Sequence, residues 1–326
     1  PTALAVGGNT ITLVAPATLG NSATAKRTVT RRLSPDLALV SVAGPSSGSF
    51  GSSIAITDTV QNTGAGYADN VTIGYYLSAD SIITTGDLYL GSRRVSYLAV
   101  GAYSTATTTV ILPTNFAPGT YYLGAIADPS NVIPELNETN NARAGNQITV
   151  TGPDLVMTAV SGPVSGFSGG TITVSDTVAN NSQVAAGAFS VGYYLSTDSV
   201  ITPSDTLLGY RNIDGLAAGG SSSGTTDVAI PLNLAPGVYY IGAIADPSNS
   251  LPEQDETNNA LTGNQITVAG PDLTVTAVSG PATGLTGGRI DVSTTVATTG
   301  AAPGFTVGIY LSPDNVITTS DMLIGV

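Results

Sequence analysis

The sequence predicts an all-β protein made of tandem immunoglobulin-like β-sandwiches, with about seven strands in each. Three observations carry this prediction. Short segments alternate between apolar and polar residues, which is the period of a half-buried strand. Turn residues separate these segments every 8 to 15 residues, and no 12-residue stretch shows a helical period. Finally, the whole pattern returns after 118 residues, so one repeat has the length of one domain.

The repeat is clearest in two segments, 119–155 and 237–273. The first reads GTYYLGAIADPSNVIPELNETNNARAGNQITVTGPDL and the second reads GVYYIGAIADPSNSLPEQDETNNALTGNQITVAGPDL, with 28 of 37 positions identical. The triplet Pro-Asp-Leu marks the same period at Pro35, Pro153 and Pro271. We therefore expect three repeats, at residues 35–152 (repeat 1), 153–270 (repeat 2) and 271–326 (the first half of repeat 3).

The strands of repeat 1 follow from local patterns taken in chain order. The expected strands are 36–42, 53–60, 71–77, 88–98, 106–112, 120–127 and 147–151. The first alternates and ends at a Gly-Pro pair, and a turn of sequence Asn-Thr-Gly separates the second from the third. The segment 88–98 is long enough for one or two strands. The fifth is rich in Thr, a residue enriched in strands.

A local signature supports the sandwich. An apolar residue, then Pro-Gly, precedes Tyr121 at the start of a strand, and the same spacing precedes Tyr239. This pattern resembles the tyrosine corner of Greek-key sandwiches, in which the hydroxyl bonds to backbone a few residues upstream. A simple turn followed by an aromatic strand is the alternative.

Residues 1–34 precede the first repeat. Residues 8–13 (GNTITL) match residues 145–150 (GNQITV), so residues 1–16 are expected to be the terminal strand of a preceding repeat. Residues 17–34 hold four of the nine basic residues. This segment is expected to be a basic linker, either solvated or docked on an acidic neighbouring domain.

Repeat 3 lacks the equivalents of residues 93–152. A half sandwich exposes its core and its unpaired strand edges. Two explanations stay open: the chain continues into a longer array, or a neighbouring copy donates its N-terminal strand to the open sheet.

Composition excludes several classes of protein. The net charge of −13 disfavours binding of nucleic acid. There is no Cys for disulfides and only one Lys, and no apolar run is long enough to form a membrane-spanning segment. The scarcity of charged residues favours a mature or partial form of an exported protein over a cytosolic one.

Two loops carry polar clusters that recur with the repeat. Crowded oxygen ligands suit Ca²⁺ better than Mg²⁺, so calcium is the expected ion, and no other cofactor is expected. The alternative is that these side chains cap their own loop backbone in Asx-turns. The candidate ligands in the first loop are Asp128, Asn131, Glu135, Asn137, Glu138, Asn140 and Asn141, with their copies Asp246, Asn249, Glu253, Asp255, Glu256, Asn258 and Asn259. The second loop contributes Asp pairs seven residues apart, namely Asp80 with Asp87, Asp198 with Asp205 and Asp314 with Asp321.

Catalysis has little support in the sequence. No His or Cys is present, so the usual nucleophile–base arrangements cannot form. Paired carboxylates could serve glycoside hydrolysis, but here they recur with the domain, which indicates a structural role. No catalytic residue is assigned, and the chain is not expected to be an enzyme. Three N-x-[ST] sequons, at Asn70, Asn137 and Asn180, are either chance in a Thr-rich chain or glycan acceptors on a secreted fibre.

Three motifs together resemble the CARDB family, the cell-adhesion-related domain found in bacteria. They are PDLxVxxV at the start of each repeat, with Leu39 and Met157 in place of the first Val in repeats 1 and 2, YYLSxD in the middle and ADPSNxxxExxExNN near the end. The resemblance covers nearly all of residues 35–326, as two full copies and a half. It implies an immunoglobulin-like sandwich, export to the surface, tandem arrays in large adhesive or structural proteins, and no catalytic activity.

Together these observations favour a structural subunit of an extracellular prokaryotic filament or surface fibre. Its expected partners are copies of itself, and its expected location is the extracellular space or cell surface of a bacterium or archaeon. Two alternatives stay open: the stalk of a cell-surface adhesin, whose binding tip would meet a cell-surface ligand, and a spacer array in a large secreted enzyme.

Overall fold

The structure is a computed structural model that describes residues 7–15, 23–31, 33–300 and 302–326. All regular elements among these residues are strands. Within the same residues, no helix has the length and apolar character needed to cross a membrane. The chain divides into two compact units, Pro1–Gly152 and Pro153–Val326, and each is described on its own.

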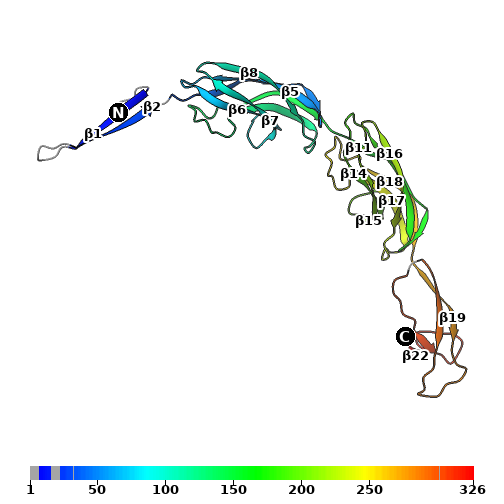
Figure 1. Cartoon of the computed structure of the whole chain (residues 1–326). Coiled ribbons are helices and arrows are strands. Elements are labelled where there is room, and N and C mark those ends of the chain that lie inside the picture. Colours follow the sequence, from blue (N-terminus) through cyan, green and yellow to red (C-terminus); the bar gives the residue numbers. More distant parts are fainter. Residues whose placement is uncertain (1–6, 16–22, 32, 301) are drawn as a thin grey trace. The chain divides into compact units, whose positions relative to one another are not determined.

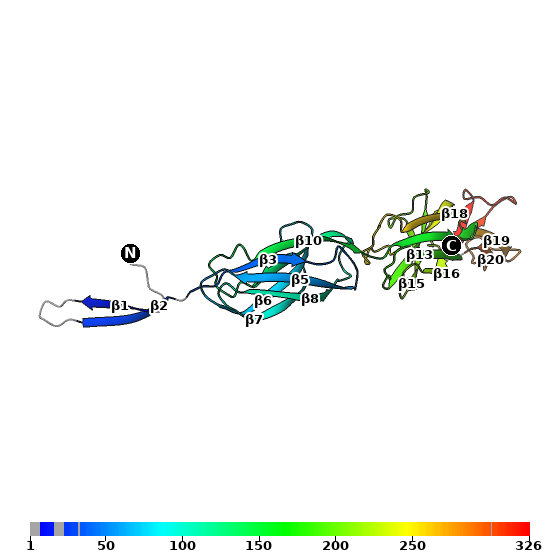
Figure 2. The ribbon, with the colours of Figure 1, turned by 90° about the horizontal axis from the view of Figure 1, so that it is seen from above.

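Repeat 1 is a β-sandwich of two sheets (Figures 1 and 2). One sheet has the strand order β3-β5-β8 and the other the order β4-β10-β9-β6-β7. Its strands are β3 (Leu37–Ala43), β4 (Ser47–Ser49), β5 (Ser53–Asn62), β6 (Ala68–Ser78), β7 (Leu88–Leu98), β8 (Tyr103–Ile111), β9 (Gly119–Ala127) and β10 (Ala142–Thr151). The expected all-β sandwich is confirmed, and segment 88–98 is a single strand.

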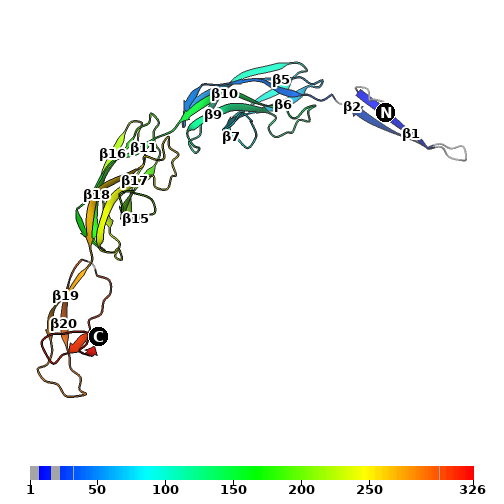
Figure 3. The ribbon, with the colours of Figure 1, turned by 180° about the vertical axis from the view of Figure 1, so that it is seen from behind.

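Repeat 2 has the same topology, with sheets β11-β13-β16 and β12-β18-β17-β14-β15 (Figure 3). Its strands are β11 (Leu155–Ser161), β12 (Ser165–Phe167), β13 (Thr171–Asn180), β14 (Phe189–Ser196), β15 (Thr206–Ile213), β16 (Ser221–Ala229), β17 (Gly237–Ala245) and β18 (Ala260–Ala269). The identical arrangement follows from the shared alternation of apolar residues.

The sequence predicts about seven strands per repeat, and each sandwich has eight. The additional strands are β4 and β12, three residues each, which pair in parallel with the last strand of their repeat. Ser47, Gly48 and Ser49 have no apolar alternation, so no local pattern reveals them. Pairing with β10, about 100 residues later in the chain, makes them a strand.

The core of each sandwich is formed by the inward-facing residues of both sheets. In β5, Ile54, Ile56 and Val60 are buried while their neighbours face outward. Tyr75 in β6 and its counterpart Tyr193 in β14 are completely buried. The alternation that predicted the strands therefore also identifies the core face.

The tyrosine corner is confirmed in both repeats. The hydroxyl of Tyr121 donates to the carbonyl of Ala117 at 2.7 Å, and that of Tyr239 donates to Ala235 at 2.9 Å. Tyr239 is buried, whereas Tyr121 is only half-buried. Burial raises the pKa of Tyr121, so its hydroxyl remains a donor.

Replacing Tyr121 by Phe is expected to lower the free energy of unfolding of repeat 1 by about 1 kcal/mol, because one hydrogen bond is lost and the ring is kept. Urea denaturation of the full chain measures this. An unchanged midpoint would mean that the hydroxyl bond adds nothing beyond the turn.

Residues 1–34 contain two strands. β1 (Gly7–Ala15) pairs antiparallel with β2 (Ala23–Arg31), with Gly7 opposite Arg31 and Ala15 opposite Ala23. The strand expected within residues 1–16 is present at 7–15. Part of the expected basic linker is itself a strand, because Thr and Val in ATAKRTVTR can extend alongside β1. The remainder of residues 1–34, apart from 33 and 34, lies outside the described residues.

Residues 271–326 contain four strands in two small sheets. β19 (Asp272–Ser279) pairs with β20 (Ser293–Thr299), and β21 (Ile309–Leu311) pairs with β22 (Met322–Gly325). Every residue of β19 is exposed, whereas its counterpart β11 contributes Leu155, Met157 and Val160 to a buried core. The apolar face of this segment is therefore not covered by its own residues.

Candidate functional site

The first polar cluster lies in the loop between β9 and β10, which we call the Asn-rich loop (residues 128–141; 246–259 in repeat 2). This loop fastens the start of its own repeat. The carboxylate of Glu135 accepts a hydrogen bond from the backbone amide of Leu37, and Nδ2 of Asn140 donates to Asp36 at 2.9 Å. The backbone amide of Leu136 donates to the carbonyl of Pro35 at 2.9 Å. The Pro-Asp-Leu triplet and the Asn-rich loop are thus one structural unit.

Repeat 2 has the same contacts. Glu253 accepts from the amide of Leu155 at 2.5 Å, and Asn258 donates to Asp154 at 2.9 Å. The amide of Gln254 donates to the carbonyl of Pro153 at 2.8 Å. In both repeats these hydrogen bonds join residues that are 98 or 104 positions apart in the sequence. The loop residues that recur in the two repeats therefore hold the first strand in its register.

The remaining side chains of the loop cap its own backbone. Asp128 accepts from the amide of Ile133 at 2.7 Å, and Asp246 accepts from Leu251 at 2.7 Å. The carboxylates of Glu138 and Glu256 accept from the backbone amides of Glu135 (2.9 Å) and Glu253 (2.8 Å), and Asn137 and Asp255 accept from Thr139 (2.7 and 3.1 Å) and Thr257 (2.6 and 2.9 Å). With its side-chain amide turned so that the nitrogen faces Glu256, Asn249 donates to both carboxylate oxygens (3.1 and 2.7 Å). Asn131 and Asn249 have a positive φ, which Asn tolerates better than most residues.

Four amide oxygens of these loops are buried without a hydrogen-bond partner. They are Oδ1 of Asn140 and Asn141 and of their counterparts Asn258 and Asn259. A cation could use such oxygens. Among the described residues, however, no three acidic side chains gather closely enough to hold a metal ion.

The second cluster, between β6 and β7 and its equivalents, consists of two adjacent turns. The first Asp of each pair accepts from the amide two residues later, as Asp80 does from Ile82 at 2.7 Å. The second accepts from an amide three residues earlier, as Asp87 does from Thr84 at 2.6 Å. Asp198, Asp205, Asp314 and Asp321 repeat these bonds at 2.6 to 2.9 Å. Turn formation accounts for the constant spacing.

Calcium binding stays a prediction that calorimetry can check. A bound ion present at 100 times its Kd stabilises the folded state by about 2.7 kcal/mol, so binding predicts that EDTA lowers the melting temperature of the full chain. Because EDTA removes both Ca²⁺ and Mg²⁺, adding Mg²⁺ alone after chelation distinguishes the two ions. An unchanged melting curve would leave backbone capping as the whole role of these residues.

Burial raises the pKa of Glu135 and Glu253, the two glutamates that hydrogen-bond to the start of their repeat. Removal from water raises the pKa of Glu253 to about 7, against the lowering effect of hydrogen bonds from Leu155 and Asn259. Glu135 behaves in the same way, with its pKa also raised to about 7. Both carboxyls therefore change charge near neutral pH while in contact with the start of their repeat.

A third polar feature, whose residues were not predicted from the sequence, lies inside the sandwiches of repeats 1 and 2. Asp58 in β5 is fully buried and forms an ion pair with Arg93 in β7, at 2.6 Å. The hydroxyl of Tyr75 donates to the same carboxylate at 2.7 Å. Burial raises the pKa of Tyr75 to about 12, so the hydroxyl keeps its proton. The signal available in the sequence was a charged residue at an inward position of an alternating strand.

Repeat 2 has the same group, in which Asp176 pairs with Arg211 at 2.5 Å and accepts from Tyr193 at 2.6 Å. Repeat 3 differs. Thr294 stands at the position of Asp176 and Ile309 at that of Tyr193. The two polar partners are thus replaced together, as expected for residues that depend on one another.

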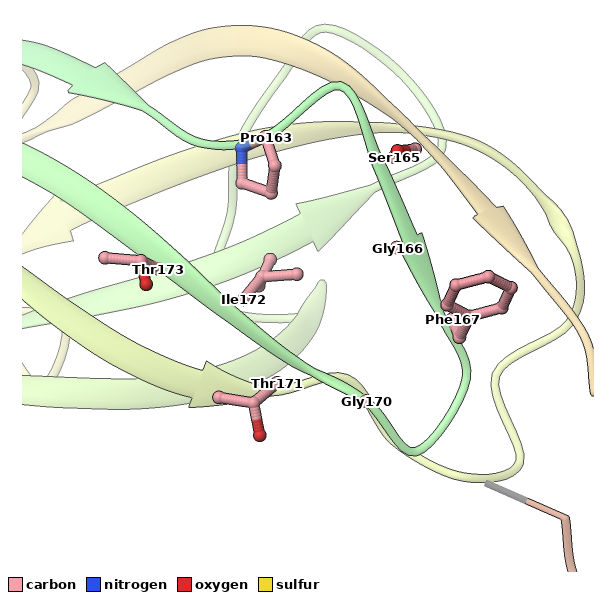
Figure 4. Close-up of a pocket in the computed structure, with 8 residues that line it drawn as sticks. All are labelled: Pro163, Ser165, Gly166, Phe167, Gly170, Thr171, Ile172 and Thr173. Atoms are coloured by element: carbon pink, nitrogen blue, oxygen red, sulfur yellow. The ribbon is translucent and has the colours of Figure 1, made fainter. Parts of the chain in front are cut away.

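A surface pocket of about 430 Å³ lies in repeat 2 between β12 and the start of β13. Figure 4 shows Pro163, Phe167 and Ile172 lining it, together with Gly and Thr residues. Its hydroxyl groups belong to Ser165, Thr171 and Thr173, and none of its lining residues is a titratable group that could serve them as a general base.

The family comparison agrees with this fold. The sequence matches the CARDB family at residues 34–145 and 152–263. No curated protein matches the chain. A crystal structure of a CARDB domain from Pyrococcus furiosus, described as a complex with di-metal ions, is 21% identical, with a TM-score of 0.28, over 36% of this chain and 89% of its own length.

A further solution structure is a domain of a predicted cell surface protein from Methanosarcina acetivorans. It is 22% identical, with a TM-score of 0.27, over 36% of this chain and 92% of its own length. The two consecutive family matches correspond to the two sandwiches described above. The chain belongs to the CARDB family.

Proposed function

We propose that this chain is a structural segment that carries tension in an extracellular filament or surface fibre, assembled with copies of itself and without catalytic activity. The observation that carries the proposal is the parallel pairing of a strand near the start of each repeat with its last strand. In repeat 1, β4 pairs with β10, and in repeat 2, β12 pairs with β18.

This pairing suits tension applied through the two ends of a repeat. Parallel strands slide past one another when their chain ends are pulled apart, so the bonds between them are loaded together and do not break one at a time. In repeat 1 the amide of Thr149 donates to Ser46 at 2.9 Å, and that of Phe50 donates to Thr151 at 3.0 Å. A hydroxyl pair, Ser49 with Thr151 at 3.0 Å, adds to them.

The Asn-rich loop adds a second fastening at the same strand. Bonds to Pro35, Asp36 and Leu37 hold the point at which the chain enters repeat 1. The first strand of each repeat is therefore held by hydrogen bonds from residues that come late in the sequence of the same repeat. Such self-contained domains are suited to repetition along a fibre.

Electron microscopy of the native material tests the proposal. Gold-labelled antibodies against repeat 1, applied to intact cells, are expected to decorate regular surface filaments. Isolated rods that end in a separate tip would instead support the adhesin stalk. Label confined to compact particles would support the spacer array, and label only after cell rupture would contradict a surface role.

A further inference from the structure

The structure separates the three N-x-[ST] sequons by their surroundings. Asn180 is only 1% exposed. Its Nδ2 donates to the carbonyls of Val184, Leu216 and Ala217 at 2.8 to 3.3 Å. The repeat 1 counterpart, Asn62, makes the same kind of contacts with Gly66 and Leu98 without being part of a sequon. A glycan on Asn180 is incompatible with this fold.

Asn137 belongs to a turn that explains its sequence. Its side-chain oxygen accepts from both the hydroxyl and the amide of Thr139. In repeat 2, Asp255 forms the same turn with Thr257, and Asp cannot accept an N-linked glycan. The Asn-x-Thr pattern at this position is therefore accounted for by backbone capping.

Asn70 has neither explanation. It is exposed at the start of β6, with φ of 54°, and it is skipped in the pairing with β7, where Asp69 pairs with Tyr97 and Val71 with Val95. Within the described part of the chain, no side-chain hydrogen bond engages it. The left-handed backbone at Asn70 interrupts the alternation of the strand without shifting its register, so that Asp69 and Asn70 are both exposed while Ala68 and Val71 are buried.

Two exposed tyrosines lie close to Asn70 in the chain or across the sheet. Tyr67 and Tyr97 are each 58% exposed, and their ring centroids are 5.5 Å apart with an angle of 34° between the planes. Tyr97 lies directly across from Asp69 in the sheet and therefore on the same face. The two neighbouring rings form a small exposed apolar surface, which a ligand with an apolar face can cover. The apolar face of a sugar ring is suited to cover a phenol ring.

Repeat 2 lacks all three residues together. The positions of Tyr67, Asn70 and Tyr97 are taken by Ala185, Ala188 and Gly215. In repeat 2 the matching strands β14 and β15 stop short of these positions, with only the bridge between Ala186 and Leu216 beyond them, and the sandwich forms all the same. The fold therefore does not require these residues, and their joint presence in repeat 1 points to one shared role.

We propose that Asn70 is an N-glycosylation site whose first sugar lies against Tyr67 and Tyr97. The donor is an oligosaccharide linked through C1 to a lipid phosphate or pyrophosphate. A bond forms between Nδ2 of Asn70 and C1 of the sugar, the bond between C1 and the phosphate oxygen breaks, the lipid phosphate leaves, and one amide proton passes to a base of the transferase. The site requires export, as the proposed function does.

Tryptic peptides test the site directly, because cleavage places each sequon on its own peptide: 33–93 for Asn70, 95–143 for Asn137 and 144–211 for Asn180. The full chain is purified from the cells that make it, and the peptides are analysed by mass spectrometry. A sugar on 33–93 and a bare 144–211 are expected. A bare 33–93, or a sugar on 144–211, overturns the proposal. The antibody labelling of intact cells described above is an independent measurement. If the chain is found at the cell surface but Asn70 carries no sugar, the glycosylation proposal is wrong and the proposed function is not affected.

Variants of Thr72 provide matched controls, because they alter the sequon without touching Asn70. Thr72→Ser keeps the sequon and should retain the sugar, whereas Thr72→Val should lose it. Loss of the sugar should lower the melting temperature of repeat 1 by about 3 °C. In a chain in which Tyr67 and Tyr97 are both replaced by Ala, removal of the sugar should leave the melting temperature of repeat 1 unchanged. If removal of the sugar lowers the melting temperature equally with the tyrosines and with the alanines, the proposed contact between the sugar and the tyrosines is wrong.

Discussion

Replacing Asp58 by Asn is expected to destabilise repeat 1 by about 3 kcal/mol, because Arg93 is left as a largely buried charge without its partner. Asp58 is completely buried, and it accepts hydrogen bonds from both Arg93 and Tyr75. Calorimetry of the full chain measures the change. The unaltered repeat 2 serves as the reference in the same molecule, and the transition of repeat 1 should move down by roughly 10 °C or more.

Repeat 3 suggests the control for this experiment. It has Thr294 and Ile309 where repeat 2 has Asp176 and Tyr193. The combined variant Asp58→Thr, Tyr75→Ile, Arg93→Leu removes the whole polar group, so no charge is left unpaired. It should cost less than Asp58→Asn alone, because well-packed apolar residues often replace a buried ion pair without loss. If the triple variant is the less stable of the two, the ion pair contributes net stability and the argument fails.

Glu135 and Glu253 should make the free energy of unfolding depend on pH. The folded pKa of Glu253 is raised to about 7 from an ordinary value of 4.5. Between these values the folded state binds more protons than the unfolded state, so the free energy of unfolding falls as pH rises from 4.5 to 7. This contribution is fully present below pH 4.5 and is lost above pH 7. Urea denaturation at a series of pH values measures the slope.

Three variants isolate Glu253 in that measurement. Glu253→Gln resembles the protonated carboxyl and should remove the contribution of repeat 2 to the slope. Glu253→Ala should lower stability by about 2 kcal/mol, because the amide of Leu155 and the side chain of Asn259 lose their acceptor. Asp227→Asn is the charge-matched control on an exposed strand position and should leave the slope intact. An unchanged slope in Glu253→Gln would show that another group titrates.

Much of the fold was determined by the sequence alone. Alternating segments such as residues 53–60 identified both the strand and its buried face, because side chains in a strand alternate between its two faces. The offset of 118 residues identified the domain size. The spacing of Pro-Gly and Tyr identified the corner at Tyr121, because its hydrogen bond spans only four residues. All of these signals are local or are repeated in the chain.

The tertiary structure alone decided what the polar residues do. The composition of the Asn-rich loop predicts calcium binding, which stays a prediction, and gives no sign that Glu135 and Asn140 bond to Leu37 and Asp36, about 100 residues earlier. Asp58, Tyr75 and Arg93 lie on three different strands, and only the register of those strands brings them together. Hydrogen-bonding side chains can serve many partners, and the partner depends on distances that arise when the two sheets pack. Strand formation follows from local patterns, whereas the roles of these side chains follow from long-range pairing.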